Sequence, residues 1–127
     1  MSNPTVILCI NDEPTILMLR KVLLSIAGYT VLTATNSESA LQLFTLNHVD
    51  LVITDQLLSG QSEAQVVTEM KRLKPEVPVI LYAASQELPP ATAQADAILV
   101  KGITPPDFLA AIAKLVAKKQ PSGGKAS

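Results

Sequence analysis

Short runs of β-branched and aliphatic residues alternate along this chain with longer stretches in which apolar residues recur at helical spacing. The short runs predict five strands, at 5–10, 30–34, 51–54, 77–83 and 97–100. The longer stretches predict helices at 14–27, 37–47, 62–73 and 105–119. Parallel strands need long crossover connections, and helices supply them between most of these strands. The alternation therefore predicts an α/β fold in which helices cover both faces of a parallel sheet.

The segment between the last two predicted strands is the weakest part of this pattern. It contains the consecutive prolines Pro89 and Pro90 and leaves only residues 89–95 for a helix. We expect that helix to be short or irregular, because proline interrupts helices and short helices are marginal. The polar tail at 120–127 is expected to be disordered, which leaves one domain at 1–119.

Composition excludes several classes of protein. Ten basic and eleven acidic residues leave a net charge of −1, which gives no basic footprint for nucleic acid. The longest apolar tract is broken by Arg20 and Lys21, so it predicts no membrane span, and the N-terminus does not resemble a signal peptide. The one cysteine, Cys9, lies in an apolar run and is expected to be a buried core thiol. We therefore expect a cytoplasmic protein.

Polar residues follow three of the predicted strands. Asn11 and Asp12 follow the first strand, Asp55 ends the third, and Lys101 follows the fifth. In a sheet of order 2-1-3-4-5, Asp12 and Asp55 meet where the strand order reverses, and the long Lys101 side chain can reach them. Two acids at one place repel each other, and a hard cation such as Mg²⁺ would relieve that repulsion. An acid, a metal ion and an ammonium group together suit a phosphoryl group.

Five segments carry a resemblance to a known family. They are "ILCINDEP", "GYTVLTATNSESAL", "DLVITD", "VPVILYAA" and "ADAILVK", in this order along the chain. Over residues 5–119 the chain resembles the receiver domain of two-component response regulators. The resemblance implies a flavodoxin-like, doubly wound fold whose five-stranded parallel sheet has the order 2-1-3-4-5.

The resemblance also implies a role for each site residue. Asp55 would be the phosphoacceptor, taking a phosphoryl group from a histidine kinase or a phosphotransfer protein. Asp12, Asp55 and the backbone carbonyl of Leu57 would ligate Mg²⁺, with Asn11 acting through a water molecule. Lys101 would pair with the phosphoryl group. For the residues alone, structural roles stay open: Asp12 could be a helix cap, Asp55 a cap or turn residue, and Lys101 an ordinary solvated lysine.

The chain departs from the family pattern at several positions. Asn11 replaces an acid, so we expect weaker Mg²⁺ binding. Ala83 stands where the family has a Thr or Ser hydroxyl, and Ile98 stands where it commonly has a Tyr or Phe. Gly102 replaces a proline that usually follows a cis bond, so a trans bond is expected here. The segment 83–101 is also shorter than usual.

Three hypotheses follow from these residues. The first is a stand-alone receiver, not an enzyme, that signals through contact with a downstream protein or with a second copy in a homodimer. The second is a degenerate receiver that binds partners without phosphorylation. A flavin-binding protein or a metal-dependent phosphohydrolase is disfavoured, because "NDEPT" is acidic and no second acid is evident near Asp55.

Overall fold

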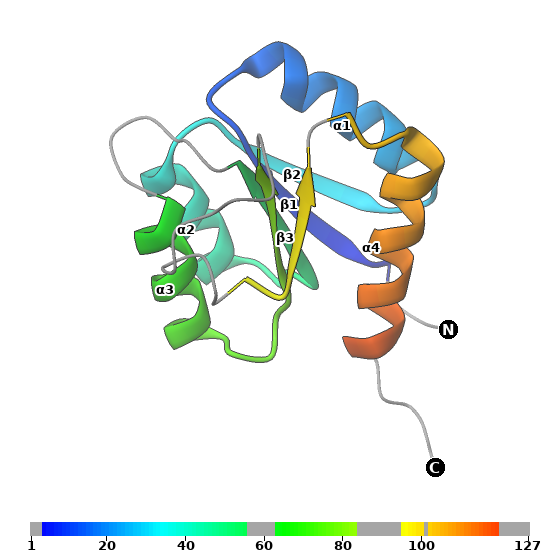
Figure 1. Cartoon of the computed structure of the whole chain (residues 1–127). Coiled ribbons are helices and arrows are strands. Elements are labelled where there is room, and N and C mark those ends of the chain that lie inside the picture. The colour runs from blue at the N-terminus through cyan, green and yellow to red at the C-terminus, as the bar shows by residue number, and fades with distance from the viewer. Residues whose placement is uncertain (1–3, 56–62, 84–94, 101, 120–127) are drawn as a thin grey trace.

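The computed structural model describes residues 4–55, 63–83, 95–100 and 102–119 (Figure 1). In chain order its elements are β1 (Val6–Ile10), α1 (Pro14–Ile26), β2 (Thr30–Ala34), α2 (Ser37–Leu46), β3 (Leu51–Asp55), α3 (Glu63–Leu73), β4 (Val79–Ala83), β5 (Ala97–Val100) and α4 (Pro105–Lys119). These bounds lie within a few residues of the predicted ones. The predicted helix at 89–95 and the tail at 120–127 lie outside the described residues.

The five strands form one parallel sheet of order β2-β1-β3-β4-β5, which confirms the predicted order. The chain winds outward in both directions from the neighbouring strands β1 and β3. In the register of these two strands Ile10 lies opposite Thr54, so Asn11 and Asp55 follow at the same edge of the sheet. This edge is the point of strand reversal at which open α/β sheets place their binding sites.

Helices cover both faces of the sheet, as the alternating pattern predicts. Figure 1 shows α1 and α4 on one face, with α2 and α3 on the other. The residues of β3 are all buried, because both of its faces pack against helices. None of the helices that the structure describes is long and apolar enough to cross a membrane.

Each face of the sheet has its own hydrophobic core. The core beneath α2 and α3 contains Leu8, Ile10, Ala34, Ala40, Phe44, Val49, Val52, Val66, Val67, Met70, Val77 and Val79. The core beneath α1 and α4 contains Ile7, Cys9, Leu17, Leu24, Val31, Leu51, Ile53, Ile80, Leu99, Phe108 and Ile112. Aliphatic side chains make up most of both cores, so burial of aliphatic surface is the main source of stability.

Cys9 is buried in the core beneath α1 and α4, as its position in an apolar run predicts. Burial raises the pKa of its thiol to about 12, while the nearby charge of Arg20 lowers that pKa by a smaller amount. An unfolded cysteine ionises near pH 8.5. The unfolded chain therefore loses this proton first, and the free energy of unfolding should fall as pH rises from about 9 toward 12.

The contribution of Cys9 is measurable as a slope. One proton corresponds to about 1.4 kcal/mol per pH unit. Urea denaturation measures the free energy of unfolding at each pH. Above about pH 9 we expect it to fall more steeply in the wild type than in Cys9→Ala, and the two slopes should differ by up to this amount. The alanine variant starts from a lower stability because it leaves a cavity, so only the slopes are compared. Parallel curves would contradict the expectation.

Candidate functional site

Asn11 and Asp55 lie in direct contact at the edge where β1 and β3 end. The Asn11 side-chain nitrogen Nδ2 donates a hydrogen bond to Asp55 Oδ2 at 2.6 Å. The backbone N–H of Glu13 donates to Asn11 Oδ1 at 2.8 Å, and this contact fixes which end of the amide faces the carboxylate. Both residues are almost fully buried. The amide therefore holds the Asp55 carboxylate in one orientation.

Arg20 approaches the other oxygen of the same carboxylate from α1. Its Nη1 and Nη2 atoms both lie 3.5 Å from Asp55 Oδ1. The two side chains are only 12% and 9% exposed, so solvent screens their attraction weakly. Asp55 thus lies between an amide and a guanidinium group, and its charge is largely balanced inside the protein.

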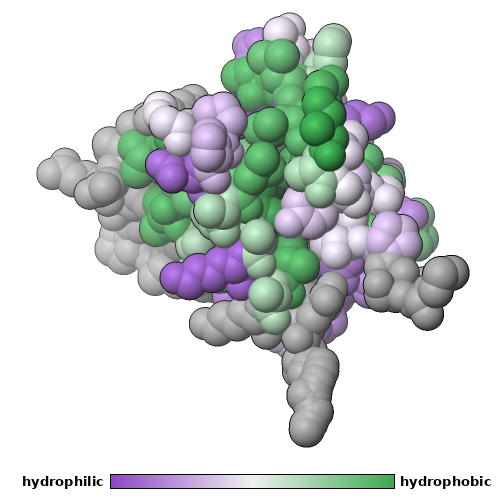
Figure 2. All heavy atoms as spheres, turned by 90° about the vertical axis from the view of Figure 1, so that its right-hand side faces the viewer, coloured by the Kyte–Doolittle hydropathy of each residue, from purple (hydrophilic) through white to green (hydrophobic). Residues whose placement is uncertain are grey.

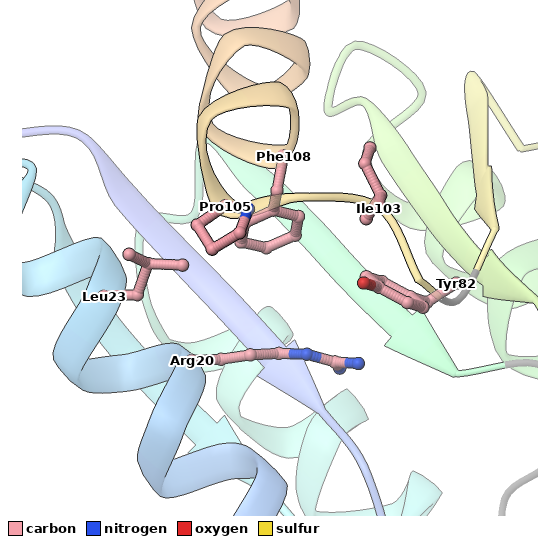
Figure 3. A pocket seen from close by; sticks show the side chains of 6 residues that line it. All are labelled: Arg20, Leu23, Tyr82, Ile103, Pro105 and Phe108. Atoms are coloured by element: carbon pink, nitrogen blue, oxygen red, sulfur yellow. The ribbon is translucent and has the colours of Figure 1, made fainter.

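Tyr82 supports the guanidinium group from the neighbouring strand. It lies opposite Asp55 in the register of β3 and β4, so the two side chains emerge on the same face of the sheet. The guanidinium carbon of Arg20 lies 4.3 Å from the centre of the Tyr82 ring. Figure 3 shows how the two side chains lie beside a pocket. This is a cation–π contact, which holds the cation beside the carboxylate.

A small open pocket adjoins this contact between α1 and α4. It has a volume of about 160 Å³ and is lined by Arg20, Leu23, Tyr82, Ile103, Pro105 and Phe108 (Figure 3). The rings of Tyr82 and Phe108 lie 6.0 Å apart and are tilted against each other. Arg20 and Tyr82 therefore connect the carboxylate of Asp55 to an apolar surface formed by both helices.

Of the remaining predicted site residues, only Asp12 lies in the part of the chain that the structure describes. Asp12 directly follows Asn11 at the same edge of the sheet and is exposed. The N-cap of α1 is Glu13, so the interpretation of Asp12 as the cap of that helix is wrong. Lys101 and Leu57 lie outside the described residues, and their proposed roles stay predictions.

The oxygen donors at this edge suit a hard cation such as Mg²⁺. Two carboxylates lie at this edge, on Asp12 and Asp55. No group of three histidine, cysteine or acidic side chains able to hold a metal ion occurs within the described part of the chain. A cation at Asp55 would also compete with the Asn11 amide and the Arg20 guanidinium for the carboxylate oxygens. The two carboxylates and the Asn11 amide oxygen are therefore donors of the kind that Mg²⁺ accepts.

Two of the departures from the family pattern can be located. Gly102 has a φ of +99°, a backbone conformation that glycine adopts freely and that proline cannot adopt. Ile98 on β5 is 41% exposed, so its side chain reaches the surface. The side chain of Ala83 is not among those that the structure describes.

Arg20 was not predicted as a site residue. In the sequence, Arg20 was interpreted only as a charged residue that interrupts an apolar tract. A signal was nevertheless present, because Arg20 follows Leu17 by three residues and precedes Leu24 by four, and both leucines are buried. This spacing places a charged residue on the core-facing side of the helix, where a charge needs a partner.

Comparisons with known proteins agree with the fold described above. The family model for the response regulator receiver domain matches residues 7–113. The transcriptional regulatory protein GlrR of Escherichia coli is 32% identical over 90 residues, which cover 71% of this chain and 20% of that protein. The chain spans between about a fifth and a half of the length of the curated relatives it matches.

Solved structures are similar over nearly the whole chain. A response regulator receiver domain protein from Clostridium thermocellum superposes with a TM-score of 0.83 at 35% identity, covering 91% of this chain and 96% of that one. The response regulator TrrA from Thermotoga maritima, solved in complex with Mg²⁺ and BeF, gives a TM-score of 0.82 at 33% identity. That match covers 87% of this chain and 98% of the TrrA chain.

Proposed function

This chain belongs to the response regulator receiver family, and from that membership we propose that Asp55 accepts a phosphoryl group from a histidine kinase or a phosphotransfer protein. Receiver domains are signalling modules of two-component systems. The observation that supports this role is the buried carboxylate of Asp55, oriented by Asn11 and balanced by Arg20 at the point of strand reversal. This carboxylate lies at the edge of the sheet where open α/β proteins bind their ligands.

The transfer has a simple balance of bonds. A carboxylate oxygen of Asp55 forms a bond to phosphorus, while the bond from phosphorus to the donor nitrogen of a phosphohistidine breaks. The released imidazole takes up a proton, and Asp55 becomes an acyl phosphate. Asn11 keeps the carboxylate facing the donor throughout, because its amide is fixed at both ends.

Mg²⁺, when bound, would neutralise charge on the phosphoryl oxygens. The residues proposed to hold it are Asp12, Asp55 and the backbone carbonyl of Leu57, with Asn11 contributing through water. Lys101 is proposed to pair with the phosphoryl group. Transfer from a histidine kinase would take place in the cytoplasm, where we propose that the protein acts.

We further propose that the domain signals through protein contacts of its own surface and turns over no separate substrate. Four apolar side chains of α1 are more than half exposed: Met18, Leu19, Val22 and Ile26. Figure 2 shows hydrophobic side chains gathered on this side of the molecule. A downstream protein or a second copy of the chain are the proposed partners, because apolar surface of this kind favours protein contacts.

The proposal is tested by intact mass after incubation with Mg²⁺ and a small phosphodonor such as acetyl phosphate. We expect one phosphoryl adduct in the wild type and none in Asp55→Asn. Asp107→Asn makes the same change at an exposed position of α4 and should keep the adduct. Absence of any adduct from folded wild-type protein would overturn the proposal.

A phosphorylation-independent interaction module is the second candidate. The observation that favours it is the guanidinium of Arg20 beside Asp55, which already balances the carboxylate without a phosphoryl group. A partner that binds wild type and Asp55→Asn equally, with or without phosphodonor, would support this candidate. A change in affinity on phosphorylation would overturn it.

A further inference from the structure

We propose that Arg20 binds the phosphoryl group on Asp55 and promotes its transfer. This inference rests on the proposed phosphorylation of Asp55 and adds a residue of α1 to the site. The family resemblance assigns no role to this arginine. Its support comes from the geometry, the charge and the surroundings of its guanidinium group.

The geometry is that of two guanidinium nitrogens directed at one carboxylate oxygen of Asp55. Nη1 and Nη2 are equally far from Asp55 Oδ1, at 3.5 Å each. Charge-assisted hydrogen bonds are shorter, at about 2.7–2.9 Å. The guanidinium is therefore aimed at the carboxylate without being closed on it. A phosphoryl group attached there brings further oxygens toward these nitrogens, and two of them can accept parallel N–H bonds.

The charge on the acceptor favours the phosphorylated state. The carboxylate carries one negative charge, whereas a bound phosphoryl group carries about −1.5 to −2 and three acceptor oxygens. Attraction to the Arg20 cation therefore grows as the group arrives. Because both side chains are mostly buried, this gain is screened less than at an open surface. An interaction that strengthens during transfer raises its rate.

The surroundings hold Arg20 in place before the reaction. The Tyr82 ring lies against one face of the guanidinium at 4.3 Å. On α1, the buried residues Leu17 and Leu24 anchor the helix on either side of Arg20. The cation is thus positioned in advance, which makes its electrostatic contribution larger than that of a mobile surface arginine.

The simpler alternative is a structural ion pair that only stabilises the fold. The two roles differ in what the removal of Arg20 changes. A structural pair affects the free energy of unfolding and leaves phosphorylation of the folded protein unaltered. A phosphoryl-binding residue affects the rate of adduct formation and the lifetime of the adduct, measured per folded molecule.

The experiment compares Arg20→Met with Lys21→Met. Lys21 is the exposed next residue of α1, so its replacement removes the same charge from the same helix. Adduct formation from acetyl phosphate with Mg²⁺ is followed by intact mass over time, at several donor concentrations. We expect Arg20→Met to be slowed by about tenfold or more, since it loses hydrogen bonds to a charged group. Lys21→Met should stay within about twofold of the wild type.

A second variant and a wild-type measurement keep the test decisive. Arg20→Lys, which keeps the charge and loses the pair of nitrogens, should be intermediate in rate. In the wild type, the NMR signals of the Arg20 guanidinium and the Tyr82 ring should shift when beryllofluoride and Mg²⁺ are added. Normal adduct formation in Arg20→Met, or an adduct that leaves both signals unmoved, would overturn this inference alone. No adduct in the wild type would overturn the proposed function itself.

Discussion

Replacing Asn11 with aspartate is expected to tighten Mg²⁺ binding by about ten- to hundredfold. Asn11 lies 2.6 Å from Asp55 and presents an N–H donor to it. A carboxylate at this position would exchange that donor for an oxygen ligand and add one negative charge beside Asp12 and Asp55. Affinity for hard cations rises with the number of charged oxygen ligands. Titration calorimetry of wild type and variant with MgCl₂ measures the difference.

The same substitution should destabilise the protein when Mg²⁺ is absent. It removes a buried hydrogen bond and places a second carboxylate against Asp55, at a cost of about 3 kcal/mol. Adding Mg²⁺ should restore much of that loss, because the cation binds only the folded state. Gln42→Glu makes the same amide-to-acid change on the exposed surface of α2 and should show neither effect. Equal Mg²⁺ affinity in Asn11→Asp and wild type would contradict the proposed metal site.

Truncating Phe44 to alanine is expected to cost about 3–5 kcal/mol of the free energy of unfolding. Phe44 is a fully buried residue of α2 and belongs to the core between the sheet and the helices α2 and α3. The Lys74 Nζ atom also lies over this ring, 4.9 Å from its centre. Domains of this size have only about 5–15 kcal/mol of stability, so the loss would be a large fraction of the whole. Urea denaturation measures it.

Leu46→Ala provides the matched control for this prediction. Leu46 lies on the same helix and is 81% exposed, so its truncation removes little buried surface. Its effect should stay within about 0.5 kcal/mol. Similar losses in the two variants would contradict the assignment of Phe44 to the core.

The arrangement of the strands could be predicted because local patterns carry it. Each strand is a short run of β-branched and aliphatic residues, and each described helix shows its own apolar stripe. The order of the sheet then follows from the family resemblance. The placement of Asp12 and Asp55 at one edge needs only this order, since parallel strands all end on the same side. These were the parts of the site that the sequence could place.

The partners of Asp55 could not be predicted in the same way. Asn11 was expected to affect the site mainly through a missing charge, whereas in the structure its amide donates a hydrogen bond to Asp55. Arg20 lies thirty-five residues before Asp55 and meets it only through the packing of α1 against the sheet. Contacts of this kind depend on the rotation of a helix about its axis. A charged residue within an apolar tract is only a weak indication of that rotation.

These contacts give the site a distinct electrostatic character. The Asn11 amide lies where the family has a second acid, and the Arg20 guanidinium faces Asp55 from α1. The negative charge of the Asp55 carboxylate is therefore compensated more fully than that of a carboxylate surrounded by other acids. We expect this balance to lower the affinity for Mg²⁺, and under the inference above Arg20 supplies part of the positive charge that phosphoryl transfer requires.

The central claim is that Asp55 itself becomes the acyl phosphate, and borohydride reduction tests it most directly. Borohydride converts an aspartyl phosphate to homoserine and leaves phosphoserine and phosphothreonine unchanged. Peptide mapping after treatment with phosphodonor, Mg²⁺ and borohydride should find homoserine at position 55, and none in Asp55→Asn. Homoserine at another acid such as Asp12, or none in folded wild-type protein, would contradict the account.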